Sequence, residues 1–129
     1  MDWQLSSANL EMIQFLRRLV QTPSPSTKEG AVAELIADEM QRLGLPGVRV
    51  DAMGNVIATL GSGEGPVLLF DAHMDTVDAG DAGAWRHDPY AAIIEDEVLY
   101  GRGAADMKGA IAAMVYSAKR LLDVGLPRQ

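Results

Sequence analysis

The stretch 67–77 reads VLLFDAHMDTV, in which four consecutive apolar residues precede three ionisable side chains. An uninterrupted apolar run gives both faces of an extended strand an apolar surface, so such a strand needs cover on both sides. The sequence therefore predicts a buried central strand. This strand is expected to carry Asp71, His73 and Asp75 to its carboxyl end, where the sites of α/β sheets usually lie.

Three amphipathic helices are predicted from apolar residues that recur at helical spacing. They cover residues 8–20, residues 26 to about 43, and residues 109–125. The second helix is expected to begin with a capping box, because Ser26 is followed three positions later by Glu29.

Two short hairpins complete the predicted elements. Residues 48–61 alternate around Gly54-Asn55, and residues 91–101 turn at 95–97. Helices interleaved with apolar strands predict an α/β fold, layered α/β/α with a mixed sheet. The chain has no linker or internal repeat, so residues 1–129 are expected to form one unit.

Composition narrows the classes of partner and ligand. The 129 residues carry a formal net charge of −7 with no basic cluster, so neither nucleic acid nor a membrane surface is an expected partner. The apolar runs are too short to span a bilayer, and the N-terminus lacks the pattern of a secretory signal. With no cysteine, a metal would have to bind to His, Asp and Glu, and a cytoplasmic location is expected.

His73 and Asp75 are candidates for a metal ligand and the acid that orients it. In an extended segment, residues i and i+2 point to the same side, so the two side chains are expected to meet. Such a partner fixes the tautomer of a ligating histidine. The same pattern also fits a histidine at a strand end that is hydrogen-bonded to a neighbouring acid.

Asp106 is the second candidate, in the stretch LYGRGAADMKGAIAAM. Glycines on either side allow the loop to present the carboxylate into a site, where it would bridge two cations. Alternatively, Asp106 caps the following helix. A phosphate-binding loop is excluded because the G-x-x-x-x-G-K-[ST] pattern is missing.

Taken together, these stretches resemble the M20 family of co-catalytic zinc hydrolases. The motifs are H-x-D after an apolar strand, W-R-H-D-P-Y at 85–90, and G-R-G-x-x-D-M-K-G at 101–109. The family includes acetylornithine deacetylase, succinyl-diaminopimelate desuccinylase, aminoacylase-1 and carboxypeptidases. The resemblance implies that the chain is the N-terminal part of a zinc-peptidase-like catalytic domain.

The resemblance also implies roles for single residues. It makes His73 a ligand of one zinc ion and Asp106 the carboxylate that bridges two. Asp75 is the one catalytic position assigned, as the acid that orients His73. A cis peptide bond is expected after the bridging aspartate, between Asp106 and Met107.

Other residues of the motifs are expected to have structural roles. Trp85 and the segment 88–90 match the rim of the family's active site, where packing is expected. His87 is expected to be a loop histidine rather than a ligand, and Lys108 to form a local structural pair. The sequence does not explain Asp71.

In the family, two Zn²⁺ ions about 3.5–4 Å apart share an acidified water, and Co²⁺ or Mn²⁺ are possible substitutes. A glutamate base then activates that water to attack an amide carbonyl. The implied substrate of a complete enzyme is a small N-acyl amino acid or a peptide, and the implied reaction is that of a deacylase, such as a deacetylase, or of a peptidase.

The resemblance covers only about the first third of such an enzyme. The Glu-Glu pair that holds the catalytic base, the further zinc ligands and the lid or dimerisation domain have no counterpart here. The isolated chain is therefore expected to be inactive, and to form homo-oligomers through an uncovered sheet edge. Two alternatives remain open, a non-catalytic binding or assembly module of the same fold and a metal-binding module without hydrolysis.

Overall fold

A computed structural model of the chain describes residues 7–61 and 63–125 and confirms the α/β class. Its elements, in chain order, are α1 (Ser7–Gln21), α2 (Gly30–Arg42), β1 (Arg49–Val50), β2 (Val56–Ile57), the 3-10 turn η1 (Ala82–Ala84), β3 (Ile93–Glu95), β4 (Val98–Tyr100), the wide turn η2 (Ala104–Lys108) and α3 (Gly109–Val124). All three predicted helices and both predicted hairpins are present. The start of the chain, used above to argue against a secretory signal, lies partly outside the described residues.

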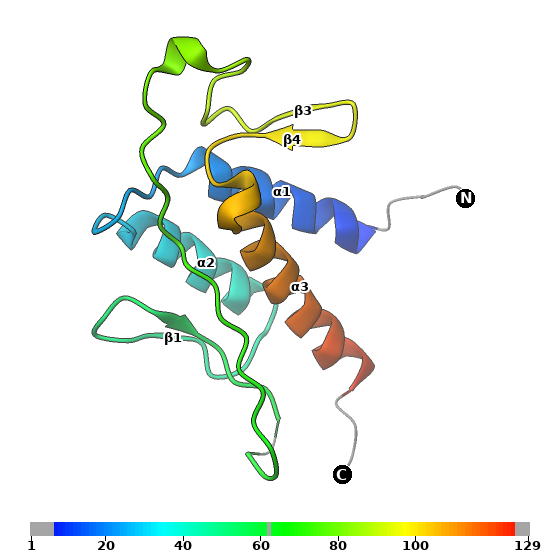
Figure 1. The fold of residues 1–129 in the computed structure, drawn as a ribbon. Coiled ribbons are helices and arrows are strands. Elements are labelled where there is room, and N and C mark those ends of the chain that lie inside the picture. The colour runs from blue at the N-terminus through cyan, green and yellow to red at the C-terminus, as the bar shows by residue number, and fades with distance from the viewer. Residues whose placement is uncertain (1–6, 62, 126–129) are drawn as a thin grey trace.

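The three helices form the core. Figure 1 shows α3 crossing α1, with α2 beneath them, and α1 contacts both other helices. Each helix contributes its apolar stripe to one cluster, whose buried members include Phe15, Leu19, Val32, Ile36, Ile111 and Val115. The helical periodicity read from the sequence is therefore satisfied by packing of helix on helix.

The C-terminus of α2 is closed by a Schellman motif. Leu45 donates its backbone N–H to the Met40 carbonyl at 3.0 Å, and Gly44 donates to Gln41 at 2.9 Å. Gly44 has φ +74°, a left-handed angle that glycine adopts without a Cβ penalty. This turn directs the chain away from α2 toward the first hairpin.

The predicted capping box at the start of α2 is wrong. Glu29 occupies the N-cap position and makes no side-chain capping bond; its carboxylate accepts the Thr27 backbone N–H at 2.7 Å. The Ser26 hydroxyl donates to Asp75 instead, at 2.5 Å. The chain bends at Thr27 (φ +73°) and the helix begins only at Gly30, which leaves Ser26 outside the helix.

Both hairpins are antiparallel and short. β1 pairs with β2, with Arg49 opposite Ile57, and β3 pairs with β4, with Glu95 opposite Val98. In the first turn, the Asp51 carboxylate accepts two backbone N–H groups. These two bonds to the Asp51 side chain stabilise the turn, because the short strands beside it form few backbone hydrogen bonds.

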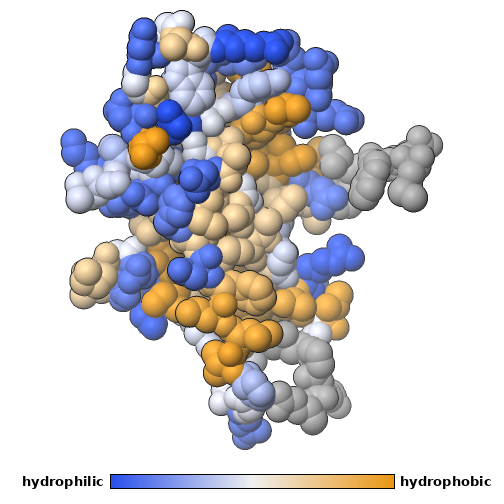
Figure 2. All heavy atoms as spheres, viewed as in Figure 1, coloured by the Kyte–Doolittle hydropathy of each residue, from blue (hydrophilic) through white to orange (hydrophobic). Residues whose placement is uncertain are grey.

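The expectation of a buried central strand at 67–77 is wrong in this structure. The segment is extended; apart from the parallel bridge between Thr76 and Pro25 it pairs with no strand among the described residues, whose sheets have two strands each. Leu69 is 87% exposed and Phe70 is 71% exposed. Figure 1 shows the segment running across one side of the molecule, and Figure 2 shows hydrophobic residues gathered there. The apolar run is present, but no neighbouring strand within the described ranges covers it.

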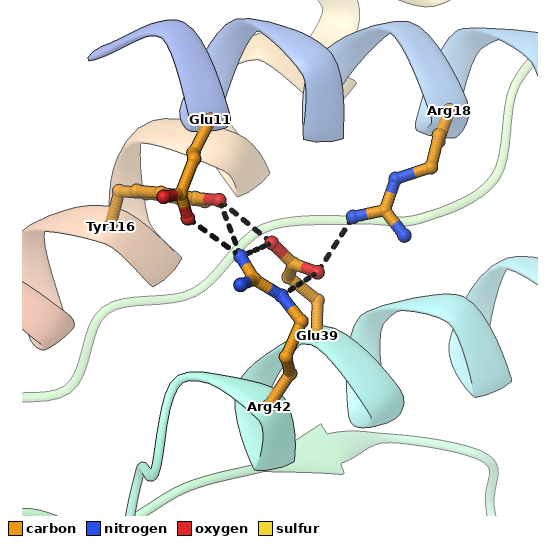
Figure 3. A network of polar contacts seen from close by, with 5 residues as sticks. All are labelled: Glu11, Arg18, Glu39, Arg42 and Tyr116. Carbon is orange, nitrogen blue, oxygen red and sulfur yellow. Dashed lines mark hydrogen bonds and ion pairs between the residues drawn. The ribbon is translucent and has the colours of Figure 1, made fainter. Parts of the chain in front are cut away.

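A buried carboxylate ties the three helices together (Figure 3). Glu39 of α2 has a side chain that is 1% exposed; it accepts hydrogen bonds from Arg18 at 2.6 Å, Arg42 at 2.8 Å and the Tyr116 hydroxyl at 2.7 Å. Burial by itself raises the pKa of Glu39, but the hydrogen bonds from Arg42, Tyr116 and Arg18 outweigh it and lower the pKa to about 2. Because Arg18 lies on α1 and Tyr116 on α3, the hydrogen bonds of this one carboxylate on α2 link all three helices.

None of the helices formed by residues 7–61 and 63–125 is long and apolar enough to cross a membrane.

The low pKa of Glu39 predicts a pH-dependent contribution to stability. The pKa falls from an ordinary value of 4.5 to about 2 on folding, so the contribution is complete above pH 4.5 and is lost as the pH falls toward 2. We expect Glu39→Gln to lower the free energy of unfolding by about 3 kcal/mol at pH 7, and by much less at pH 3. Urea unfolding at both pH values measures this, with Glu34→Gln on the exposed side of α2 as the control. An equal effect of Glu39→Gln at both pH values would contradict the prediction.

Candidate metal centre

The predicted site residues His73 and Asp106 lie together in the structure. The Nε2 atom of His73 is 2.9 Å from Oδ1 of Asp106, although 33 residues separate them in the sequence. His73 lies on the extended segment and Asp106 on η2, so the contact joins two loops that precede different elements. The sequence alone does not say how far apart these two residues lie, and the fold brings them within hydrogen-bond distance.

The other ring nitrogen of His73 faces Asp75, as the alternation of an extended segment predicts. Nδ1 lies 3.0 Å from the Asp75 backbone carbonyl and 3.2 Å from Oδ1 of its carboxylate. The hydrogen bond to Asp106, followed by that to the Asp75 backbone, raises the pKa of His73 above its usual value. Both nitrogens face acceptors, so the arrangement favours positive charge between two carboxylates.

Local backbone geometry presents the Asp106 carboxylate to solvent. Gly103 has φ +76°, and an added Cβ there would lie 2.5 Å from Cγ2 of Thr76. The Asp106 side chain is 87% exposed, and the Asp106-Met107 peptide bond is cis, as expected. Lys108 occupies the N-cap position of α3 without a side-chain capping bond. The alternative that Asp106 caps the helix is therefore wrong.

Lys108 anchors this loop to the end of α1. Its Nζ donates to the Leu19 carbonyl at 2.9 Å and to the Thr22 carbonyl at 2.8 Å. Burial lowers the pKa of Lys108 to about 8. The predicted structural role of Lys108 is confirmed, but its partners lie far away in the sequence rather than nearby.

The segment that follows α1 holds the second loop of the site. Ser24 is fully buried; its hydroxyl donates to the Met74 carbonyl at 2.8 Å, and its own carbonyl accepts the Thr76 N–H at 2.8 Å. Ser26 donates to the Asp75 carboxylate, which holds the pKa of that carboxyl below its usual value. The sequence analysis missed these serines because it treated the Pro-Ser alternation only as a helix break.

A cleft of about 270 Å³ lies over these residues. Its lining includes His73, Asp75, Asp106 and Arg102. The Arg102 guanidinium lies 4.8 Å from the centre of the Trp85 ring, and its buried Nε has no hydrogen-bond partner. Sequence reasoning also missed Arg102, whose place beside the cleft could have been suspected from the G-R-G motif.

Trp85 and His87 of the W-R-H-D-P-Y motif make structural contacts. The Trp85 indole N–H donates to the Ala79 carbonyl at 2.9 Å. His87 hydrogen-bonds to the Glu95 carboxylate at 3.1 Å and packs against the Tyr100 ring. Neither of these partners lines the cleft of His73.

The donors of the site suit a divalent metal in kind. An imidazole nitrogen and a carboxylate oxygen are typical zinc ligands, and Asp75 stands behind the histidine as an orienting acid should. The number of such donors is small: the part of the chain that the structure describes contains no group of three or more metal-ligating side chains. The metal-binding roles of His73 and Asp106 stay predictions.

Known proteins are similar to this chain in sequence and in fold. The model of the peptidase family M20/M25/M40 matches residues 69–129. The uncharacterized protein YgeY of Escherichia coli is 42% identical over 116 residues, which are 90% of this chain and 28% of that protein. The succinyl-diaminopimelate desuccinylase of Maricaulis maris is 39% identical over 126 residues, 96% of this chain and 32% of that enzyme.

A solved structure agrees with these matches. The M20 family metallo-carboxypeptidase of Sulfolobus solfataricus superimposes with a TM-score of 0.72 at 26% identity, covering 93% of this chain and 28% of that structure. The chain spans less than a third of the length of each of these relatives.

The close approach of Gly103 to Thr76 predicts a sharp effect of a single methyl group. We expect Gly103→Ala to lower the free energy of unfolding by at least about 1–2 kcal/mol, because of its left-handed backbone and the contact with Cγ2 of Thr76. Thr76→Ser removes that methyl group, so Gly103→Ala should cost less in that background. Denaturant unfolding of the four proteins of this cycle measures the coupling.

Gly30→Ala is the matched control, because an added Cβ at Gly30 meets nothing within 4 Å. We expect it to leave stability unchanged or slightly raised. An equal cost of Gly103→Ala with and without the threonine methyl group would show that the contact does not limit this position.

Proposed function

We propose that this chain, which is similar in sequence to the M20/M25/M40 peptidases, is the N-terminal part of the catalytic domain of a metal-dependent hydrolase that cleaves an amide or peptide bond. The observation that carries the proposal is the His73 ring held between Asp75 and Asp106 at the cleft. We also propose a cytoplasmic location, which rests on the absence of cysteine.

In this proposal, His73 and Asp106 hold the divalent metal, with zinc as the first choice and Co²⁺ or Mn²⁺ as substitutes. When bound, such a metal acidifies a water molecule and polarises a carbonyl oxygen. A pair of zinc ions bridged by Asp106 is the finer form of the proposal. Its support is the 87% exposure of the Asp106 side chain, which leaves the carboxylate open to more than one partner.

The residues of this chain prepare the ligands. The backbone carbonyl and the carboxylate of Asp75 face Nδ1 of His73 and would accept a hydrogen bond from an Nδ1–H, which leaves the lone pair of Nε2 for a metal. The contact between Nε2 and Asp106 lies where a cation would replace the shared proton. Asp75 therefore acts by orienting His73.

The substrate class is proposed from the relatives. One is a succinyl-diaminopimelate desuccinylase and another is a metallo-carboxypeptidase, so a small N-acyl amino acid or a peptide is the class that both names support. Reading the coding sequence beyond residue 129 tests the assignment. An in-frame continuation with a Glu-Glu pair supports an enzyme, and its absence favours a binding or assembly module of this fold.

The metal proposal predicts weak zinc binding by the chain itself. We expect calorimetric titration with Zn²⁺ to detect one weak site. Removing a direct ligand should cost at least the roughly 10–100-fold that loss of outer-shell partners costs, so His73→Ala and Asp106→Ala should abolish detectable binding. His87→Ala is the matched control, because His87 is hydrogen-bonded to Glu95. Unchanged affinity in His73→Ala would contradict the site.

The shortage of ligands predicts the absence of catalysis by these 129 residues. A catalytic zinc site uses three protein ligands, whereas His73 and Asp106 supply two. We expect the purified chain with zinc to hydrolyse N-succinyl and N-acetyl amino acids no faster than zinc in buffer. Hydrolysis by the wild-type chain that is lost in Asp106→Ala would overturn this expectation.

We further propose that a second copy of the chain covers the exposed apolar segment 67–70. The segment is extended, pairs with no strand within the described ranges, and includes Leu68 at 82% exposure. An exposed extended segment of this kind invites pairing with another chain.

Self-association through this segment is directly measurable. Size-exclusion chromatography with light scattering should show a dimer or larger species that dissociates on dilution. Leu69→Lys places a charge in the segment and should yield a monomer. Met53→Lys, at another highly exposed apolar side chain, should leave the oligomer intact. A wild-type monomer at every concentration would contradict the proposal.

A further inference from the structure

We infer that Ser26 is a positioning residue for the metal site, which acts on His73 through Asp75. The inference concerns the Pro-Ser segment that follows α1, to which the proposed function gives no role. It rests on the proposed function for its consequence on metal affinity, whereas its geometric part stands on the contacts of Ser26, Asp75 and His73 alone.

The two oxygens of the Asp75 carboxylate have different partners. Oδ2 accepts the Ser26 hydroxyl at 2.5 Å, and Oδ1 faces Nδ1 of His73 at 3.2 Å, beside the Asp75 backbone carbonyl at 3.0 Å. A carboxylate with one bonded oxygen is free to turn about its last side-chain bond. With Oδ2 held by Ser26, rotation would break a charge-assisted hydrogen bond, so Oδ1 stays on the histidine.

The position of Ser26 is itself fixed by its neighbours. Ser24 forms hydrogen bonds with Met74 and Thr76, one on either side of Asp75. Pro25 forms a parallel bridge with Thr76, and its ring fixes φ at this point of the segment. The chain at 24–26 therefore runs beside 74–76 in a set register, which places the Ser26 hydroxyl opposite the carboxylate.

The solvent exposure of Asp75 limits how much the loss of the Ser26 hydroxyl is expected to weaken zinc binding. The Asp75 side chain is 38% exposed, so water would replace the Ser26 hydroxyl as a donor without fixing the carboxylate. Loss of an outer-shell partner typically weakens metal binding about 10–100-fold. Ser26 lies one step further from the metal, so we expect Ser26→Ala to weaken zinc binding by about 3- to 10-fold.

The first measurement needs no metal. The nitrogen signals of the His73 imidazole, recorded by NMR at one fixed pH in the metal-free chain, report its tautomer and ring order. The chain has two histidines, and His87 contacts Glu95 and Tyr100, so its signals are the internal reference. We expect Ser26→Ala to shift or broaden the His73 signals and to leave those of His87 unchanged.

Conservative variants separate positioning from folding. Ser26→Thr keeps the hydroxyl and should restore the wild-type His73 signals. Ser26→Cys keeps the size but is a weak donor, so it should resemble Ser26→Ala; it replaces that variant if the alanine protein does not fold. Ser117→Ala, on the exposed side of α3, is the matched control and should change neither histidine.

The second measurement is a double-mutant cycle of zinc affinity with Asp75→Ala. Ser26→Ala should weaken binding in the wild-type background and have no effect once Asp75 is removed. An equal loss in both backgrounds, or unchanged His73 signals in both Ser26→Ala and Ser26→Cys, would overturn the inference.

The outcomes distinguish this inference from the proposed function. If the wild-type chain binds no zinc, the metal proposal fails and the His73 signals alone decide the role of Ser26. If zinc binds equally well to wild type and Ser26→Ala and the His73 signals are unchanged, the inference fails while the metal proposal stands.

Discussion

The site depends on one short segment, residues 19–26 at the end of α1 and just beyond it. The carbonyls of Leu19 and Thr22 hold the buried ammonium of Lys108, which fixes the loop of Asp106. Ser24 holds the backbone on either side of Asp75. Buried polar groups need hydrogen-bond partners, and both loops of the site form theirs with this one segment. The segment 19–26 therefore fixes the loop of His73 and the loop of Asp106 relative to each other.

The charges around His73 explain why both loops must be held in place. Asp75 and Asp106 both approach the ring of His73, and even a protonated imidazole carries one positive charge against two carboxylates, which leaves the group net negative. The arrangement stores an attraction for positive charge at the cleft, as expected of a site that receives a cation. Glu39 shows the opposite solution, because one buried carboxylate is matched by two arginines and serves the stability of the core.

Sequence predicted the local features well and the long-range ones poorly. The three helices, both hairpins and the meeting of His73 with Asp75 follow from periodicities of a few residues. The capping box failed because the chain bends at Thr27 and leaves Ser26 outside the helix, where its hydroxyl donates to Asp75, 49 positions away. The buried strand at 67–77 failed because burial needs a neighbouring strand, and a hydrophobic pattern predicts the need for cover without supplying it.

The sequence by itself determined which groups are available: helices with apolar stripes, glycines that allow the turns, and a histidine and two acids as the candidate donor set, with no cysteine. Only the tertiary structure decided which of them meet. The contact between His73 and Asp106 spans 33 residues, and the hold of Lys108 on Leu19 spans 89. Local periodicity carries no information on such distances, because they are set by how the helices pack and which buried polar groups must be satisfied.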